Sequence, residues 1–139
     1  MNESRNQTGS VVIELLAALA LVIPLLYLAV ALSRVGAAQF AAEVGAREAV
    51  RAMMGASSSI EGQRLTTTAV ALALSDQGFI LDEDTVSLDC SADPCLTPDE
   101  WITAQVRVAV PLPGAPGLPP LVTVESFHSG RVPHFTPTR

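Results

Sequence analysis

The chain has 139 residues, enough for one modest domain, and 49% of them are hydrophobic although only 4% are aromatic. Lysine does not occur, and eight arginines stand against fourteen acidic residues, which gives a net charge of -6. This charge opposes binding to phosphate backbones, so we expect no nucleic-acid partner.

The N-terminal part of the chain changes abruptly from polar to apolar after residue 9. Residues 15–32 are eighteen positions without a charge, and a helix of that length spans about 27 Å, close to the roughly 30 Å of a bilayer's hydrocarbon core. We therefore predict a leader at 1–9 and a transmembrane helix at 10–34. Pro24 lies inside the apolar run, where its missing backbone hydrogen bond predicts a kink rather than the end of the helix.

Helical periodicity continues beyond the apolar run, and we expect a helix extension at 35–58. One of its faces carries small residues, among them Ala41, Gly45 and Ala49 at fourfold spacing. This small-xxx-small pattern lets helix backbones approach closely, so these three residues and Pro24 are candidates for helix packing. Alanine is also a strong helix former, which explains the same residues without any packing.

Residues 59–139 are predicted to form a small domain. A second, short helix is expected from Glu61 to about Gln77, where apolar residues recur at threefold and fourfold spacing. The period then changes to two, which predicts three strands, at 86–90, 102–110 and 122–125. A proline- and glycine-rich link precedes the last strand, and we expect a loose tail from Gly130. The predicted fold class is α+β: a long N-terminal helix, a second short helix and a small antiparallel sheet of about three strands.

The two cysteines, Cys90 and Cys95, are separated by a segment in which Asp93 and Pro94 favour a turn. Their even number and close spacing predict a disulfide, which indicates an oxidising compartment. Closing so short a loop would stabilise the domain by about 2 kcal/mol. A pair of free buried thiols is the alternative, because two cysteines alone do not define a disulfide framework.

The residue with the clearest functional implication is Glu14, a lone carboxylate near the start of the apolar run. An ionisable group at the centre of a membrane helix costs about 2.5 kcal/mol or more, so it requires a partner. If the chain is cut after Gly9, Ser10 gains an α-ammonium, and Glu14 lies four residues further along the same helix face. In a bundle of such helices, the carboxylate of one subunit could pair with the ammonium of a neighbour and set their axial register.

The run from Gly9 to Glu14, followed by apolar residues, resembles the class III signal of type IV pilins. In that signal, prepilin peptidase cuts after the glycine and a glutamate is fifth in the mature chain. The longer stretch GSVVIELLAALALVIPLLYLAV, with its central proline, resembles the start of TadE-like proteins, which are minor pilins or pseudopilins of the tight-adherence (Flp) pilus system. The resemblance covers residues 8–34, roughly a fifth of the chain.

This resemblance implies a processing site at Gly9 and Ser10, and a role for Glu14 in recognition and assembly. It implies prepilin peptidase, other pilin subunits, the Tad inner-membrane assembly platform and membrane lipid as partners. The expected location is the inner membrane, with a cytoplasmic N-terminus, a single span and an extracytoplasmic domain at 59–139, followed by the pilus or cell envelope after processing.

Two rival interpretations remain open. In a secreted protein, Ala29, Val30 and Ala31 would form an A-x-A signal-peptidase site, although the apolar region of such a signal has no use for a carboxylate. In a plain single-span anchor presenting a binding domain, Glu14 would face a partner membrane protein.

An enzyme is not expected, because the sequence lacks a nucleophile elbow, a P-loop and an H-E-x-x-H motif. His128 and His134 lie in a poorly patterned C-terminal part without clustered partners. Acidic residues between 82 and 89 lack the glycine and terminal glutamate of a calcium-binding loop, so we expect neither metal nor cofactor. Trp101 is expected to anchor the core of the sheet.

Overall fold

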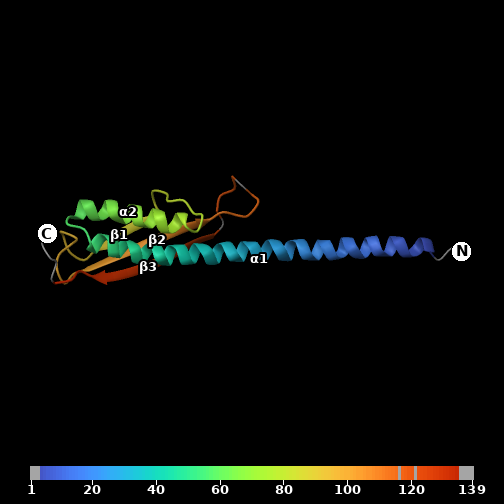
Figure 1. Ribbon diagram of the computed structural model, residues 1–139, viewed down its shortest axis with the longest axis horizontal. Coiled ribbons are helices and arrows are strands. Elements are labelled where there is room, and N and C mark those ends of the chain that lie inside the picture. Colours follow the sequence, from blue (N-terminus) through green and yellow to red (C-terminus); the bar gives the residue numbers. More distant parts are fainter. Residues whose placement is uncertain (1–3, 116, 121, 135–139) are drawn as a thin grey trace. The chain divides into compact units, whose positions relative to one another are not determined.

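The computed structural model describes residues 4–115, 117–120 and 122–134, and among these the side chains from Val11 onward (Figure 1). The chain divides after Arg34 into two units, Met1–Arg34 and Val35–Arg139. The first unit is helical throughout its described part, and the second contains two helical segments and a sheet. The predicted helix extension at 35–58 therefore lies within the second unit.

The first element, α1, runs from Ser4 to Met54 and contributes to both units. Its 51 residues correspond to about 77 Å of helix. The helix continues through Pro24 without a break, as the sequence predicts. It stops where the backbone N–H of Gly55 donates to the carbonyl oxygen of Arg51 and the chain turns.

The second helix, α2, runs from Ser59 to Ser75, two residues earlier at each end than the sequence predicts. Ser58 is its N-cap, since its hydroxyl accepts a hydrogen bond from the backbone N–H of Glu61 at 3.3 Å. The Glu61 carboxylate in turn accepts from the backbone N–H of Ser57 at 3.1 Å and from the Ser57 hydroxyl. The Ser58 bond satisfies a donor that the first turn of a helix leaves without a partner, and the Glu61 bonds hold the residue before the cap, which explains the early start.

The three strands form one antiparallel sheet in the order β1-β2-β3. Their bounds are Val86–Cys90 for β1, Trp101–Val110 for β2 and Val122–Arg131 for β3. The register pairs Ala104 of β2 with Leu88 on one side and His128 on the other. The predicted α+β fold class is thus confirmed.

The last strand differs from its sequence prediction. It extends to Arg131, whereas alternation of apolar and polar residues ends near Glu125. Pairing with β2 continues through Arg131, and the backbone N–H of Val132 then donates to the carbonyl oxygen of Glu100 at 2.8 Å. Val132 is buried, so Gly130 to Val132 are ordered rather than part of a loose tail. Residues 135–139 lie outside the described part.

The core lies between one face of the sheet and the two helices. Every second residue of β2 from Ile102 to Val110 is buried, as its sequence predicts. The four from Ala104 to Val110 pack against the alanine-rich face of α1 and against Val70 and Leu74 of α2, whereas Ile102 packs with Met53 and Val132. Trp101 lies on the opposite face and is 53% exposed, so the expectation that it anchors the core was wrong. Strand alternation places Ile102 inward and therefore its neighbour outward.

Candidate functional site

The first candidate feature is the apolar segment at the start of α1. Every residue from Val11 to Val30 is exposed, including its leucines, isoleucines and valines. The helix from Val11 to Met54 is long and apolar enough to cross a membrane, and none of its most apolar window is buried within the structure. A core helix of a soluble protein would be mostly buried, whereas an N-terminal signal sequence would meet the same criteria.

The predicted processing site lies on this helix. The backbone is helical at Gly9 and Ser10 and remains so through Glu14, so residues 10 and 14 are one turn apart on the same face. The Glu14 side chain is exposed between Ile13 and Leu15, which are exposed as well. None of the ion pairs formed by the described side chains involves Glu14. The carboxylate is therefore presented on an apolar surface without an intramolecular counter-charge among those side chains.

The other residues predicted for helix packing fall into two environments. Pro24 is exposed within the apolar segment. Ala41, Gly45 and Ala49 are buried inside the second unit.

The small residues of α1 allow close packing on α2 and β2. A Cβ atom added at Gly45 would lie 3.6 Å from Cγ1 atoms of both Val70 and Val106. The Thr66 hydroxyl donates to the carbonyl oxygen of Ala49 at 3.1 Å, which ties α2 to α1 inside the core. The face formed by Ala41, Gly45 and Ala49 is thus covered by other parts of the same unit and is not a free surface for another helix.

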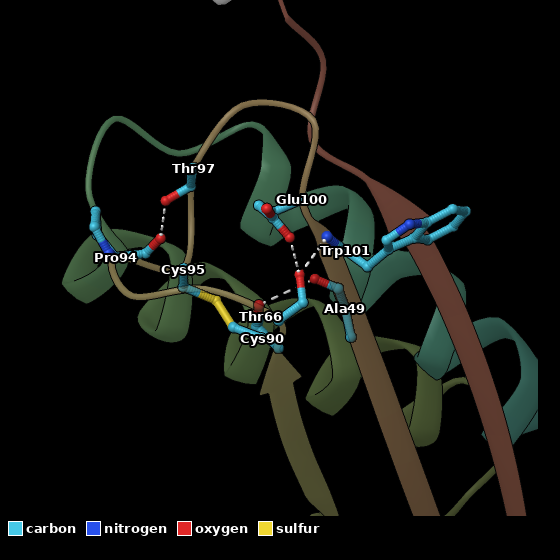
Figure 2. Close-up of a disulfide and its surroundings, with 9 residues drawn as sticks. Ala49, Thr66, Cys90, Pro94, Cys95, Thr97, Glu100 and Trp101 are labelled. Atoms are coloured by element: carbon cyan, nitrogen blue, oxygen red, sulfur yellow. Dashed lines mark hydrogen bonds between the residues drawn. A yellow bond between two sulfur atoms is a disulfide. The ribbon is translucent and has the colours of Figure 1, made fainter.

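A disulfide joins Cys90, the last residue of β1, to Cys95 in the connection to β2 (Figure 2). The two Cα atoms are 5.2 Å apart. Next to it, the Ser91 hydroxyl accepts from the backbone N–H of Trp101 at 2.8 Å and donates to the Glu100 carboxylate at 2.6 Å. The indole of Trp101 points away from the disulfide in Figure 2. The bond and these contacts fix the β1–β2 connection.

A polar cluster that the sequence did not reveal lies beside this connection. The Asp99 carboxylate is 2.8 Å from His134 Nδ1 and 3.5 Å from Arg131 Nη2. The backbone of Asp99 has φ of 67°, a conformation that few residues other than glycine adopt. The guanidinium of Arg131 also donates to the Asp99 carbonyl oxygen at 2.8 Å. These bonds close the end of the sheet and explain why the chain is ordered beyond Glu125.

No metal-binding arrangement is formed by the described residues, since they contain no group of three or more histidine, cysteine or acidic side chains placed to hold an ion. The acidic residues Asp82, Asp84 and Asp89 are all exposed.

No family model, curated protein or solved structure matches this chain. A functional assignment therefore rests on the residues and their geometry. The feature with the most chemical content is the exposed apolar helix with Glu14 one turn beyond Ser10.

Proposed function

We propose that this chain is a minor pilin or pseudopilin of a tight-adherence (Flp) type pilus, cleaved by prepilin peptidase between Gly9 and Ser10 and assembled through its N-terminal helix. The observation that supports the proposal is an exposed carboxylate, Glu14, on a helix whose surroundings from Val11 to Val30 are otherwise uncharged and exposed. Such a surface is stable only in an apolar environment, and such a carboxylate is stable there only with a counter-charge.

Cleavage would create that counter-charge. The new α-ammonium of Ser10 and the Glu14 carboxylate would both enter an apolar environment when helices associate, and each alone would be strongly penalised. An ion pair between the ammonium of one subunit and the carboxylate of its neighbour removes both free-energy costs. It forms only when the two helices are shifted along their axes by one particular distance. The same two residues thereby define the processing site and the register of assembly.

The proposed location is the inner membrane, with the N-terminus in the cytoplasm and residues 35–139 on the other side. The prepilin peptidase, other pilin subunits and the Tad assembly platform are its proposed partners. The Cys90–Cys95 disulfide supports this orientation, because disulfides persist in oxidising compartments.

The deciding experiment is the intact mass of the protein recovered from membranes of cells that contain its own prepilin peptidase. Removal of nine of the 139 residues would leave a mature chain of 130. The Gly9→Leu variant should remain a membrane-bound precursor of full length. A mature chain that begins at Leu32 would favour the secreted-protein alternative, and an uncut chain in the presence of the peptidase would favour the plain anchor.

Orientation can be measured separately with the two cysteines. Thiol labelling of freshly isolated protein should give no modification before reduction and two modified sites after it. Labelling of both thiols without reduction would remove the support that the disulfide gives to an extracytoplasmic domain.

A further inference from the structure

The last strand of the sheet has one open edge. β3 pairs with β2 on one side, and the sheet order β1-β2-β3 places no other described strand on its second side. The ten residues of β3, Val122–Arg131, include no proline, and their register with β2 advances one residue for one, without a bulge. Since proline and bulges are common ways of protecting an edge strand, β3 presents a long and regular edge.

The hydrogen bonds of β2 show which backbone groups of β3 face this edge. The backbone N–H of Arg107 donates to the carbonyl oxygen of Thr85 at 2.7 Å. The carbonyl oxygen of Trp101 accepts from the backbone N–H of Ser91 at 3.0 Å. Because backbone groups alternate in direction along a strand, odd-numbered residues of β2 bond toward β1 and even-numbered ones toward β3. The register pairs even-numbered residues with even-numbered residues, so the odd-numbered residues of β3 direct their N–H and C=O groups to the open edge.

The residues that supply these groups are all exposed: Thr123, Glu125, Phe127, Ser129 and Arg131. Two of them carry charges of opposite sign, six positions apart. The Glu125 carboxylate is 2.8 Å from Arg107 Nε, and the Asp99 carboxylate is 3.5 Å from Arg131 Nη2. Strand alternation places both charged side chains on the face of the sheet opposite the helices.

We propose that β3 pairs with the β3 strand of a second copy of this chain, antiparallel and centred on His128. In that register, Glu125 of each copy lies opposite Arg131 of the other. The edge is thus complementary to itself in charge, and opposite charges directly across two strands stabilise their pairing. A register centred on Phe127 would instead place Glu125 opposite Ser129 and would give neither charge a new partner.

The pairing joins two three-stranded sheets into one sheet across two copies. Backbone groups that face the open edge in one copy gain hydrogen-bond partners from the other copy. The ion pairs of the two copies also join into one row of alternating charge, formed by Arg107, Glu125, Arg131 of the second copy and its Asp99. The inference concerns the second unit alone and does not rest on the proposed function or on the position of the first unit.

The test is disulfide cross-linking of the full chain in detergent micelles. His128 is exposed, and in the proposed register it lies opposite His128 of the second copy as a non-hydrogen-bonded pair. The Cα atoms of such a pair are about 4.5 Å apart, and a disulfide spans about 4.4–6.8 Å. Under mild oxidation, His128→Cys should therefore give about ten times more covalent dimer than Leu72→Cys, an exposed position on α2.

Proline at an odd-numbered position tests whether the contact uses the open edge. Ser129→Pro removes one N–H group at that edge and no hydrogen bond to β2. Ser129→Ala is the matched control, because both variants lose the hydroxyl contact with Thr103 and only proline loses the N–H group. In the His128→Cys chain, Ser129→Pro should lower the dimer yield to that of Leu72→Cys, and Ser129→Ala should keep it within about twofold. Phe127→Pro and Phe127→Ala form a second pair with the same expectation.

Four results would overturn the proposal. Equal yields from His128→Cys and Leu72→Cys would show no specific contact at β3. Cross-linking that survives both proline variants would mean association through another surface, such as the apolar helix. A higher yield from Phe127→Cys than from His128→Cys would exclude the register that pairs the charges. Loss of hydrogen-exchange protection in β2 in both proline variants would mean that these N–H groups are bonded within one chain.

Discussion

The two halves of α1 have the same secondary structure but opposite surroundings. Residues 11–30 present leucine, isoleucine and valine side chains that are all exposed. Beyond Val35, the helix turns a face of alanine and glycine toward the sheet, and Ala38, Ala41 and Ala42 are completely buried. The exposed half carries large apolar side chains, whereas the buried face of the second half is built of small ones.

This difference has a physical cause. Small side chains allow a helix to approach a sheet closely. Because protein interiors are close-packed, the sheet must then present a surface whose shape matches that of the helix. Large apolar side chains that no part of the chain covers suit an apolar environment such as the hydrocarbon core of a bilayer. The first half of α1 is therefore suited to contact with lipid or with other molecules. The buried face of the second half is already packed against residues of its own chain.

The largest expected effect concerns the charge in the first half. Glu14→Gln should be inserted and cleaved but should not assemble, because the Ser10 ammonium would lose its partner in an apolar environment. Such an unpaired charge costs several kcal/mol, enough to lower incorporation by orders of magnitude. The measurement is co-purification with pili, normalised to membrane-inserted subunit.

His128→Ala is the matched control for this experiment and should process and assemble normally. It is a cleaner control than His134→Ala, since His134 pairs with Asp99. Normal assembly of Glu14→Gln would refute charge pairing even if the protein were a pilus component.

The next largest effect concerns the core that buries the second half of α1. Leu74 is fully buried in the core and Leu72, on the same helix, is exposed. Leu74→Ala should lower the free energy of unfolding by about 2–5 kcal/mol, because it leaves a cavity. Leu72→Ala should change it by less than about 0.5 kcal/mol. Native-state hydrogen exchange of the β2 amides measures both, and equal effects would contradict the assigned faces.

A swap of side-chain sizes sharpens the comparison within α1 itself. Ala42→Leu forces extra volume into the buried face and should destabilise the second unit by about 1–3 kcal/mol. Leu21→Ala removes similar volume from the exposed segment and should leave exchange in β2 unchanged. Protection lost in β2 after Leu21→Ala would mean that the two halves are not independent.

The smallest effect concerns acid sensitivity at the start of α2. Hydrogen bonds from the Ser57 hydroxyl and backbone N–H, aided by the charge of Arg64, hold the pKa of Glu61 below its usual value of 4.5. A lowered pKa in the folded state gives stability that is present above pH 4.5 and is lost as the pH falls through the folded pKa.

The free energy of unfolding, measured from pH 6 to pH 3, should therefore fall less steeply in Glu61→Gln than in the unmodified protein. Ser57→Ala, which removes the hydroxyl donor, should reduce the pH dependence in the same direction. Identical slopes in all three proteins would contradict this assignment.

Most of the fold could be predicted because its signals are local. The alternation along β2 sets its buried face. Apolar periodicity predicted α2 but placed its start two residues late, because the N-cap at Ser58 lies outside the periodic positions. The extension of β3 could not be predicted, because its inward positions beyond Glu125 are serine, histidine and glycine. At Gly130 that space is filled by Val50, whose Cγ1 would lie only 2.6 Å from an added Cβ.

The candidate site divides in the same way. Gly9, Ser10 and Glu14 follow from a contiguous pattern, and their spacing on one helix face needs no tertiary information. The surface that packs on Ala41, Gly45 and Ala49 could not be predicted from the sequence, because small residues permit close approach to any backbone. The chain's own β2 fills that role.

The contact between Val50 and Gly130 also has a consequence for synthesis, because it joins an early part of the second unit to a late one. A ribosome needs about 4–16 s to add the roughly eighty residues between them. During that interval Val50 has been made, but Gly130 of β3, which lies against it, has not. A nascent chain released before β3 is complete would lack this contact and the pairing of β3 with β2, so the second unit can close only after its last strand has been made.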